Sequence, residues 1–222
     1  VTTPAGLGVE TRYVGWGAGI VDLDNDGRPD LFVVSGAVYP ELEAKLPAYP
    51  HKNPRLVFRQ LPNGSFEELI AQAGPGVAAS HSSRGCAFGD FDNDGDIDIL
   101  ILNMNEPPSL LRNDCKGGNW LKVKLSGVKS NRSAIGAAVR VKSSTKVEVR
   151  NVEVQEVMSQ SSFLSVNDPR LHFGLGDVAL VDVEIRWPNG LRQSFSKIEV
   201  NQLIEIDEAK GITAKRKPPF SS

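Results

Sequence analysis

Short stretches in which apolar and polar residues alternate recur along the chain, and no long stretch has helical periodicity. Residues 119–125, 147–154 and 181–187 all alternate in this way. The last of them runs into a Pro-Asn-Gly turn at 188–190 and then into residues 191–195, which is the pattern of a β-hairpin. With 14 proline and 21 glycine residues along the chain, this pattern predicts an all-β fold.

One motif occurs twice in the first half of the chain. Residues 17–34 align with residues 86–102, and each copy contains the acidic sequence Asp-x-Asp-x-Asp-Gly-x-x-Asp. β-Branched, aliphatic and aromatic residues flank each acidic segment, so we expect each to be a loop of a β-hairpin. In such a turn the first, third and fifth side chains converge, and Gly27 and Gly95 allow the positive φ that folds the chain back.

The donor set of each loop predicts a metal site. The carbonyl oxygen of the seventh residue and the carboxylate of the ninth complete six or seven hard oxygen donors, which suit Ca²⁺ better than zinc or copper. Two calcium sites are therefore predicted, with ligands from Asp22, Asp24, Asp26, Arg28 and Asp30 in the first loop and from Asp90, Asp92, Asp94, Asp96 and Asp98 in the second. Arg28 and Asp96 would contribute only their carbonyl oxygens.

Two other interpretations of the loops are weaker. An EF-hand needs a glutamate at position 12 between helices, but Val33 and Ile101 occupy that position here. A purely solvated acidic turn is the other alternative. Two carboxylates ~5 Å apart repel by about 3 kcal/mol at an effective dielectric constant of ~20, so several such pairs call for a cation.

The charge distribution supports this interpretation and excludes other classes of protein. Residues 1–117 contain 9 Lys and Arg against 16 Asp and Glu, whereas residues 118–222 contain 16 against 11. The net charge of −2 gives no basic field for nucleic acid, so no nucleic-acid partner is expected. No apolar stretch reaches the roughly 20 residues of a membrane-spanning helix, so the chain is not expected to span a membrane.

The two motif copies resemble FG-GAP (VCBS-type) repeats, and the second half of the chain resembles the ASPIC/UnbV domain of cartilage-acidic-protein-like proteins. The second resemblance rests on residues 119–121, 130–137, 163–165, 167–176 and 186–190. It implies a calcium-loaded binding protein that is extracellular or periplasmic, with blade-like repeats of a β-propeller. We expect a leader segment to be removed before Val1.

The expected organisation has three parts. Residues 1–117 form two FG-GAP-type calcium-binding repeats, residues 118–208 form an ASPIC/UnbV-like domain resembling a β-sandwich, and residues 209–222 form a basic, proline-rich tail. Since a closed propeller takes four to eight blades, two repeats make an incomplete propeller with exposed strand edges. Further blades or a protein partner are therefore expected.

The expected function is a binding, adhesion or scaffold module without catalytic residues. The alternative is an accessory or catalytic component of a secondary-metabolite biosynthesis pathway, which would need His81 or Cys86 in a pocket with an acid; His172 is predicted to be a packed strand residue. Cys86 and Cys115 form a disulfide or remain free thiols. The basic residues of the second half make either a solvated face or a surface for an acidic glycan: Lys122, Lys124, Arg140, Lys142, Lys146 and Arg150.

Overall fold

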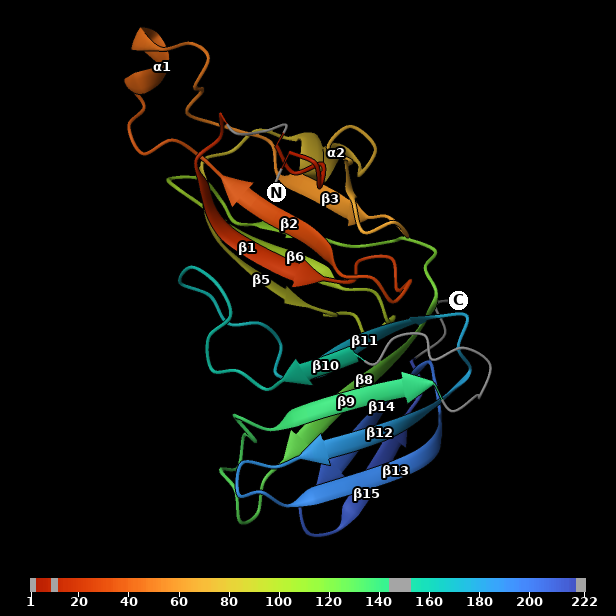
Figure 1. Cartoon of the computed structure of the whole chain (residues 1–222). Coiled ribbons are helices and arrows are strands. Elements are labelled where there is room, and N and C mark those ends of the chain that lie inside the picture. Colours follow the sequence, from red (N-terminus) through yellow and green to blue (C-terminus); the bar gives the residue numbers. More distant parts are fainter. Residues whose placement is uncertain (1–2, 9–11, 144–152, 219–222) are drawn as a thin grey trace.

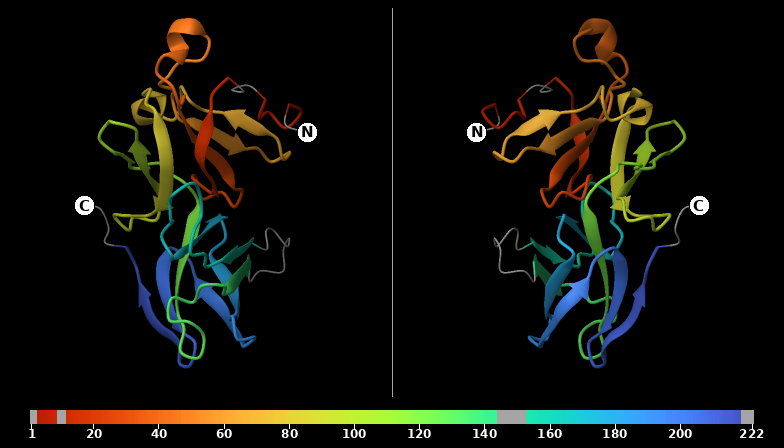
Figure 2. Two further views of the ribbon diagram at one scale, coloured as in Figure 1. Left: turned by 90° about the vertical axis from the view of Figure 1, so that its left-hand side faces the viewer. Right: turned by 90° about the vertical axis from the view of Figure 1, so that its right-hand side faces the viewer.

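The computed structural model describes residues 3–8, 12–143 and 153–218, and nearly all of its regular structure is β (Figure 1). The chain forms two parts that lie end to end, with the N-terminal sheets at one end and a sandwich at the other (Figure 2). The all-β prediction is therefore confirmed. Of the predicted strand at 147–154, the final two residues belong to a strand, and residues 147–152 lie outside the described part.

The N-terminal part contains two antiparallel sheets. The first has the order β1-β2-β3-β4, and the second has the order β5-β6-β7. Their strands are β1 (Gly15–Val21), β2 (Asp30–Ser35), β3 (Leu56–Gln60), β4 (Phe66–Glu68), β5 (Ser83–Gly89), β6 (Asp98–Asn103) and β7 (Ser109–Leu111). Two single-turn helices, α1 (Leu42–Lys45) and α2 (Pro75–Ala78), lie in the connections that follow β2 and β4.

These two sheets pack against each other through small residues on β1. A Cβ atom on Gly19 would overlap the ring of Phe88, and one on Gly17 would lie 2.8 Å from the carbonyl oxygen of Arg84. Phe32 and Phe88 meet edge to face, with ring centroids 5.9 Å apart. The glycines ahead of the first loop thus allow the close strand packing that fixes the two hairpins side by side.

The C-terminal part is a sandwich of two four-stranded sheets, of order β10-β9-β12-β13 and β11-β8-β14-β15. Its strands are β8 (Asn119–Ser126), β9 (Ala138–Ser143), β10 (Glu153–Glu156), β11 (Leu171–Gly176), β12 (Leu180–Arg186), β13 (Arg192–Glu199), β14 (Gln202–Asp207) and β15 (Gly211–Arg216). The predicted hairpin is confirmed as β12 and β13. Fully buried Trp187 lies in the core between the sheets.

The predicted tail is wrong over much of its length. β15 pairs antiparallel with β14, from Leu203 opposite Arg216 to Asp207 opposite Gly211, so the sandwich extends to Arg216. Gly211 has φ +76° and permits the turn into β15, and Ile212 packs partly against the core. A strand forms despite the basic composition because the apolar side of β15 completes the sheet, while Arg216 pairs with Glu205 at 3.2 Å.

A segment of the sandwich between β10 and β11 reaches the inner edges of both N-terminal sheets. Ala18 donates its N–H to the hydroxyl of Ser162 at 2.8 Å, and Asp168 donates its N–H to the carbonyl of Phe88 at 2.9 Å. Phe163 packs on Trp16, with ring centroids 5.1 Å apart. These contacts supply hydrogen-bond partners at the edges of β1 and β5, so the sequence-based expectation of open edges does not hold at these positions.

Candidate metal centres at the junction of the two halves

Both acidic loops lie at the end of the N-terminal hairpins that faces the sandwich. The first loop (residues 22–30) connects β1 to β2, and the second loop (residues 90–98) connects β5 to β6. Each hairpin is antiparallel, and its register closes with the ninth loop residue, Val21 opposite Asp30 and Gly89 opposite Asp98. The loops therefore sit on hairpins, as their flanking residues predict.

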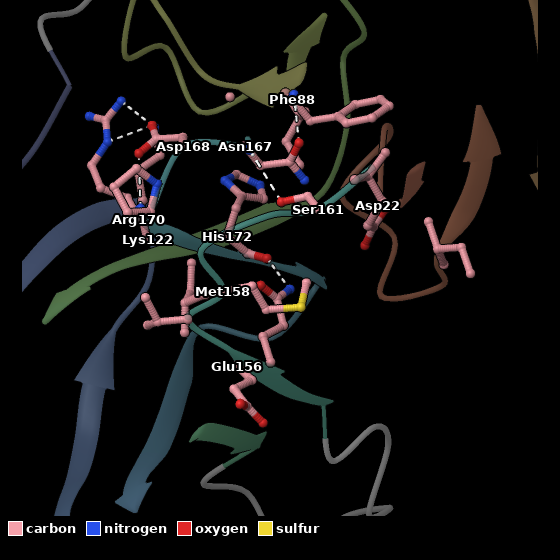
Figure 3. A pocket seen from close by; sticks show the side chains of 18 of the residues that line it. Asp22, Phe88, Lys122, Glu156, Met158, Ser161, Asn167, Asp168, Arg170 and His172 are labelled. Carbon is pink, nitrogen blue, oxygen red and sulfur yellow. Dashed lines mark hydrogen bonds and ion pairs between the residues drawn. The ribbon is translucent and has the colours of Figure 1, made fainter. Parts of the chain in front are cut away.

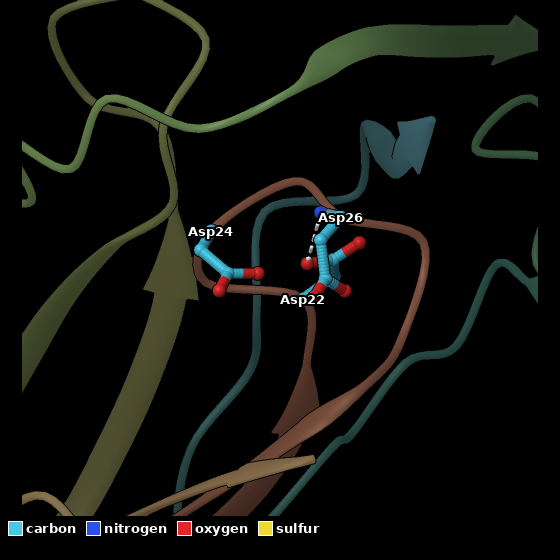
Figure 4. Close-up of side chains that lie close together, drawn as sticks. All are labelled: Asp22, Asp24 and Asp26. Atoms are coloured by element: carbon cyan, nitrogen blue, oxygen red, sulfur yellow. Dashed lines mark hydrogen bonds between the residues drawn. The ribbon is translucent and has the colours of Figure 1, made fainter. Parts of the chain in front are cut away.

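In the first loop, carboxylate oxygens of Asp22, Asp24 and Asp26 all lie within 4.8 Å of one another (Figure 4). Asp22 is held by N–H groups of the loop, from Asp26 at 3.1 Å and Gly27 at 2.7 Å. Gly27 has φ +82°, which turns its N–H toward Asp22. Oδ1 of Asp24 is buried and has no hydrogen-bond partner within the described residues. This loop gathers three carboxylates and leaves one buried oxygen for a further ligand.

The second loop has a similar arrangement with a different third member. Carboxylate oxygens of Asp90, Asp92 and Asp98 lie within 4.8 Å of one another. Asp90 accepts an N–H from Gly95 at 3.0 Å, and the φ of Gly95 is +105°. Oδ1 of Asp90 is buried and is also unpartnered among the residues that the structure describes. Both loops therefore contain a donor set that fits a hard cation, with an orphaned oxygen in each.

The ninth carboxylates also fix the loops to neighbouring backbone. Asp30 accepts N–H groups from Leu23 at 3.1 Å and Gln60 at 2.8 Å. Asp98 accepts the equivalent pair, from Phe91 at 2.9 Å and Asn113 at 2.8 Å. In each copy one carboxylate thus joins the loop to the strand or segment beside it.

The other predicted ligands take several positions. Asp94 accepts the N–H of Asp96 at 2.9 Å and does not belong to the three-carboxylate cluster. The Asp96 side chain accepts a hydrogen bond from the first loop, and the Arg28 guanidinium pairs with Asp26. The carbonyl ligands assigned to Arg28 and Asp96 remain predictions, as do the full ligand sets.

The electrostatics of the loops favour a cation. Burial, together with the charges of Asp26 and Asp24, raises the pKa of Asp22 to about 8, although the hydrogen bonds from the N–H groups of Gly27 and Asp26 act in the opposite direction. Burial likewise raises the pKa of Asp30 to about 6 and, with Asp94 as the next cause, that of Asp96 to about 7. A raised pKa means that the ionised carboxylate is unfavourable in the loop without a cation. A bound positive charge would stabilise that ionised form.

The second loop already has a positive charge from the sandwich. Lys122 on β8 is 2% exposed, and its ammonium contacts Oδ2 of Asp90. Burial lowers the pKa of Lys122, while its hydrogen bond to Asp90 raises it. This places Lys122 inside the junction, so its assignment to a solvent-exposed basic face is wrong.

Much of that predicted basic face is also neutralised. Lys142 pairs with Glu184 at 2.6 Å, and Lys124 lies 3.9 Å from Glu205. Arg140 is exposed, whereas Lys146 and Arg150 lie outside the described residues. The described members of that predicted face therefore offer an acidic glycan less positive charge than the sequence suggested.

Sequence reasoning missed the asparagine at the fourth position of each loop. Asn25 and Asn93 both have a left-handed backbone, with φ +55° and +61°. Asn25 accepts a hydrogen bond from Nε2 of His172 at 2.7 Å, and Asn93 accepts one from Arg170 at 2.6 Å. The recurrence of Asn at the same motif position was the available signal, but its partners on the sandwich could not be identified locally.

A cleft of about 420 Å³ lies between the two halves (Figure 3). Figure 3 shows the paired Asp168 and Arg170 next to Lys122, with His172 further along the cleft. Burial, and then the charge of Lys122, lowers the pKa of His172 to about 3, so its imidazole is neutral. His172 lies on β11, as predicted for a packed strand residue.

The residues considered for catalysis lie elsewhere. Nδ1 of His81 is 2.8 Å from Oε2 of Glu106, and Lys52 contacts the same carboxylate. Cys86 and Cys115 are both free thiols, the first buried and the second exposed. Within the described residues, neither His81 nor Cys86 lines this cleft.

Comparison with known proteins finds a family match within each half of the chain. Residues 47–101 match the FG-GAP-like repeat family, and residues 127–213 match the ASPIC and UnbV family. The N-terminal part of the chain is thus similar to an FG-GAP-like repeat, and the sandwich is similar to an ASPIC/UnbV domain. The FG-GAP match contains the second loop, and the ASPIC/UnbV match reaches into β15, in agreement with the extended sandwich.

Three curated relatives match most of this chain. The chain is 29% identical over 193 residues to cartilage acidic protein 1 of Mus musculus, 27% over 193 residues to that of Homo sapiens and 28% over 195 residues to that of Xenopus tropicalis. Each match covers 83% of this chain but 27% of the relative, so the chain spans about a quarter of their length. In the described part of the chain no helix is long and apolar enough to cross a membrane.

Proposed function

We propose that this chain is an extracytoplasmic calcium-binding module that acts as a binding, adhesion or scaffold unit. Two Ca²⁺ ions would be held, one by the FG-GAP loop at residues 90–98 and one by the related loop at residues 22–30. Carboxylate oxygens suit Ca²⁺, whereas Mg²⁺ demands near-octahedral geometry and retains several waters. A bound Ca²⁺ ion supplies the positive charge that relieves repulsion among the carboxylates.

One observation carries this proposal. Oδ1 of Asp24 and Oδ1 of Asp90 are buried without a hydrogen-bond partner in the described residues, and each lies in a cluster of three carboxylates. A buried, unpaired carboxylate oxygen costs free energy, because its hydration is lost and nothing replaces it. The orphaned oxygen belongs to the third residue of the first loop and to the first residue of the second, and its presence in both clusters supports a ligand of positive charge in each loop.

The test is thermal unfolding with calcium and with chelator. A ligand that binds only the folded state adds about 2.7 kcal/mol to the free energy of unfolding when it is 100-fold above Kd. We expect chelation to lower the melting temperature and Mg²⁺ to restore it poorly. Equal melting temperatures in millimolar calcium and in chelator would refute calcium binding.

A role without catalysis is supported by the states of buried Cys86 and His172. Burial raises the pKa of the Cys86 thiol to about 12, so it remains protonated and is a poor nucleophile. His172 is neutral and hydrogen-bonded within the junction. Backbone N–H groups hold the first and ninth carboxylates of each loop in place, which suits a structural metal site.

The location follows from the type of site. Extracellular calcium modules have Kd values of about 10⁻⁴–10⁻³ M, and these loops have no glutamate at position 12 to strengthen binding. The curated relatives carry a name that refers to cartilage. An extracellular or periplasmic location therefore fits the proposed sites. A micromolar or tighter Kd would remove this argument.

Exposed apolar residues support a protein partner or additional blades. Leu100 and Leu102 on β6 and Leu110 on β7 are 47%, 55% and 52% exposed, and Leu100 lies opposite Leu110. β7 is also an edge of its sheet, with unpaired backbone groups along the strand. Light scattering at micromolar concentration tests self-association, and a Leu100→Lys variant that associates as the wild type does would exclude this face as the contact between copies.

A further inference from the structure

The Asn25 side chain connects the two loops directly. It is 1% exposed, and its Nδ2 donates to the carbonyl oxygen of Gly95 at 3.1 Å and to Oδ1 of Asp96 at 2.9 Å. Both acceptors belong to the second loop. Asn25 itself lies between Asp24 and Asp26, two members of the first carboxylate cluster. A movement of one loop therefore changes the hydrogen bonds of the other.

The same residue joins both loops to the sandwich. Since both Nδ2 hydrogens go to the second loop, Oδ1 of Asn25 is the acceptor for His172, whose Nε2 carries the proton. The backbone carbonyl of Asn25 accepts the N–H of Gly176 at 2.8 Å, and the carbonyl of Asp24 accepts that of Gly118 at 3.0 Å. Three separate parts of the chain thus meet at Asn25.

The bonds of Asn25 require one particular shape of the first loop. Its φ of +55° directs the side chain away from the carboxylate cluster and toward the second loop. Ligands that converge on a cation at Asp24 and Asp26 would restrict the backbone on both sides of Asn25. A cation in the first loop therefore favours the conformation in which the second loop receives its two hydrogen bonds.

We propose that Asn25 is a positioning residue that couples the two calcium sites, so that occupation of one loop raises the calcium affinity of the other. This inference rests on the proposed function. Coupling between sites is reciprocal, and it is typically about fivefold to 150-fold in affinity. We expect at least about fivefold positive coupling in the wild-type chain.

The test is a calcium titration of the wild type and of Asn25→Gly by isothermal calorimetry. Glycine tolerates the left-handed backbone, so the substitution removes the Asn25 side chain and its hydrogen bonds while the shape of the loop stays accessible. We expect the variant to bind two ions with independent affinities. Asn105→Gly is the matched control, because Asn105 has φ +54° in an exposed turn remote from the loops, and it should retain wild-type coupling.

A second measurement serves if Asn25→Gly folds poorly. Asp92→Ala disables the second site, and coupling predicts that the remaining first site binds calcium about fivefold or more weakly than in the wild type. If folded Asn25→Gly keeps the wild-type coupling between the two calcium sites, or if the first site of Asp92→Ala keeps its wild-type calcium affinity, the coupling inference is overturned and the proposed function is not. A wild type that binds no calcium overturns the proposed function as well, so the two failures are distinguishable.

Discussion

The first loop lies beside the partly exposed guanidinium of Arg28, whereas the second loop contacts the buried ammonium of Lys122. Both loops have the same motif. The positive charge beside the carboxylates comes from the loop itself in the first loop and from the sandwich in the second. Burial accordingly raises the pKa of Asp22 to about 8. The stability of the first loop therefore depends more on an external cation, and that of the second loop depends more on contact with the sandwich.

The largest expected effect comes from Lys122→Met, which keeps most of the apolar stem and removes the charge beside Asp90. Breaking a buried ion pair by removing one partner costs about 3–5 kcal/mol. We expect a loss of this size in chemical denaturation with chelator, and a smaller loss with calcium. Lys142→Met is the control, because its pair with Glu184 is exposed and is expected to contribute about 0–1 kcal/mol. Equal losses in the two variants would contradict the comparison.

Loss of one calcium site is expected to have the next largest effect. Each site contributes about 2.7 kcal/mol at calcium 100-fold above Kd. Asp24→Ala and Asp92→Ala should each abolish roughly half of the calcium-dependent increase in stability, measured by denaturation with and without chelator. Full retention of that increase in either variant would show that the substituted loop binds no ion.

The pH dependence separates the loops further. The pKa of Asp22 rises from 3.8 to about 8, so its stabilising contribution is full below pH 3.8 and is lost as pH rises through about 8. Without calcium, stability should fall by about 1.4 kcal/mol per pH unit within this window. Asp22→Asn should reduce the slope and leave the smaller contributions of Asp30 and Asp96, and saturating calcium should flatten the profile of the wild type. A chelated wild type whose stability rises from pH 5 to 7 would contradict this account.

The smallest expected effect concerns Arg28. Its guanidinium pairs with Asp26 and so competes with a cation for that carboxylate. Because partly exposed pairs contribute about 0–1 kcal/mol, Arg28→Ala should tighten calcium binding in the first loop by up to about fivefold. Calorimetric titration checks the affinity, and Lys142→Ala, which breaks an exposed pair with Glu184 on the sandwich, is the comparison. Weaker calcium binding in Arg28→Ala would show that Arg28 supports the site.

The hairpins and the acidic loops could be predicted because their signals are local. Alternation and the Pro-Asn-Gly turn specify β12 and β13, and the spacing of the aspartates brings three of them together in each loop. The junction could not be predicted, because Asn25 and His172 are 147 positions apart in the chain. Lys122 could not be placed for the same reason. The alternating pattern around it predicts a strand, but only tertiary packing decides that its side chain faces Asp90.

The predicted C-terminal boundary of the sandwich was wrong for a related reason. Basic and proline-rich composition suggested a tail, yet Gly211 and Ile212 give β15 a turn and an apolar contact that complete the sheet. Strand pairing of this kind depends on the neighbouring edge of β14, which composition does not reveal.

The most direct test of the central claim is the calcium stoichiometry of the purified chain, measured by native mass spectrometry together with calorimetry. The account predicts two ions per wild-type chain, one in Asp24→Ala, one in Asp92→Ala and none when the two substitutions are combined. Absence of bound calcium in the wild type, or two ions in the double variant, would contradict the assignment of both loops as calcium sites.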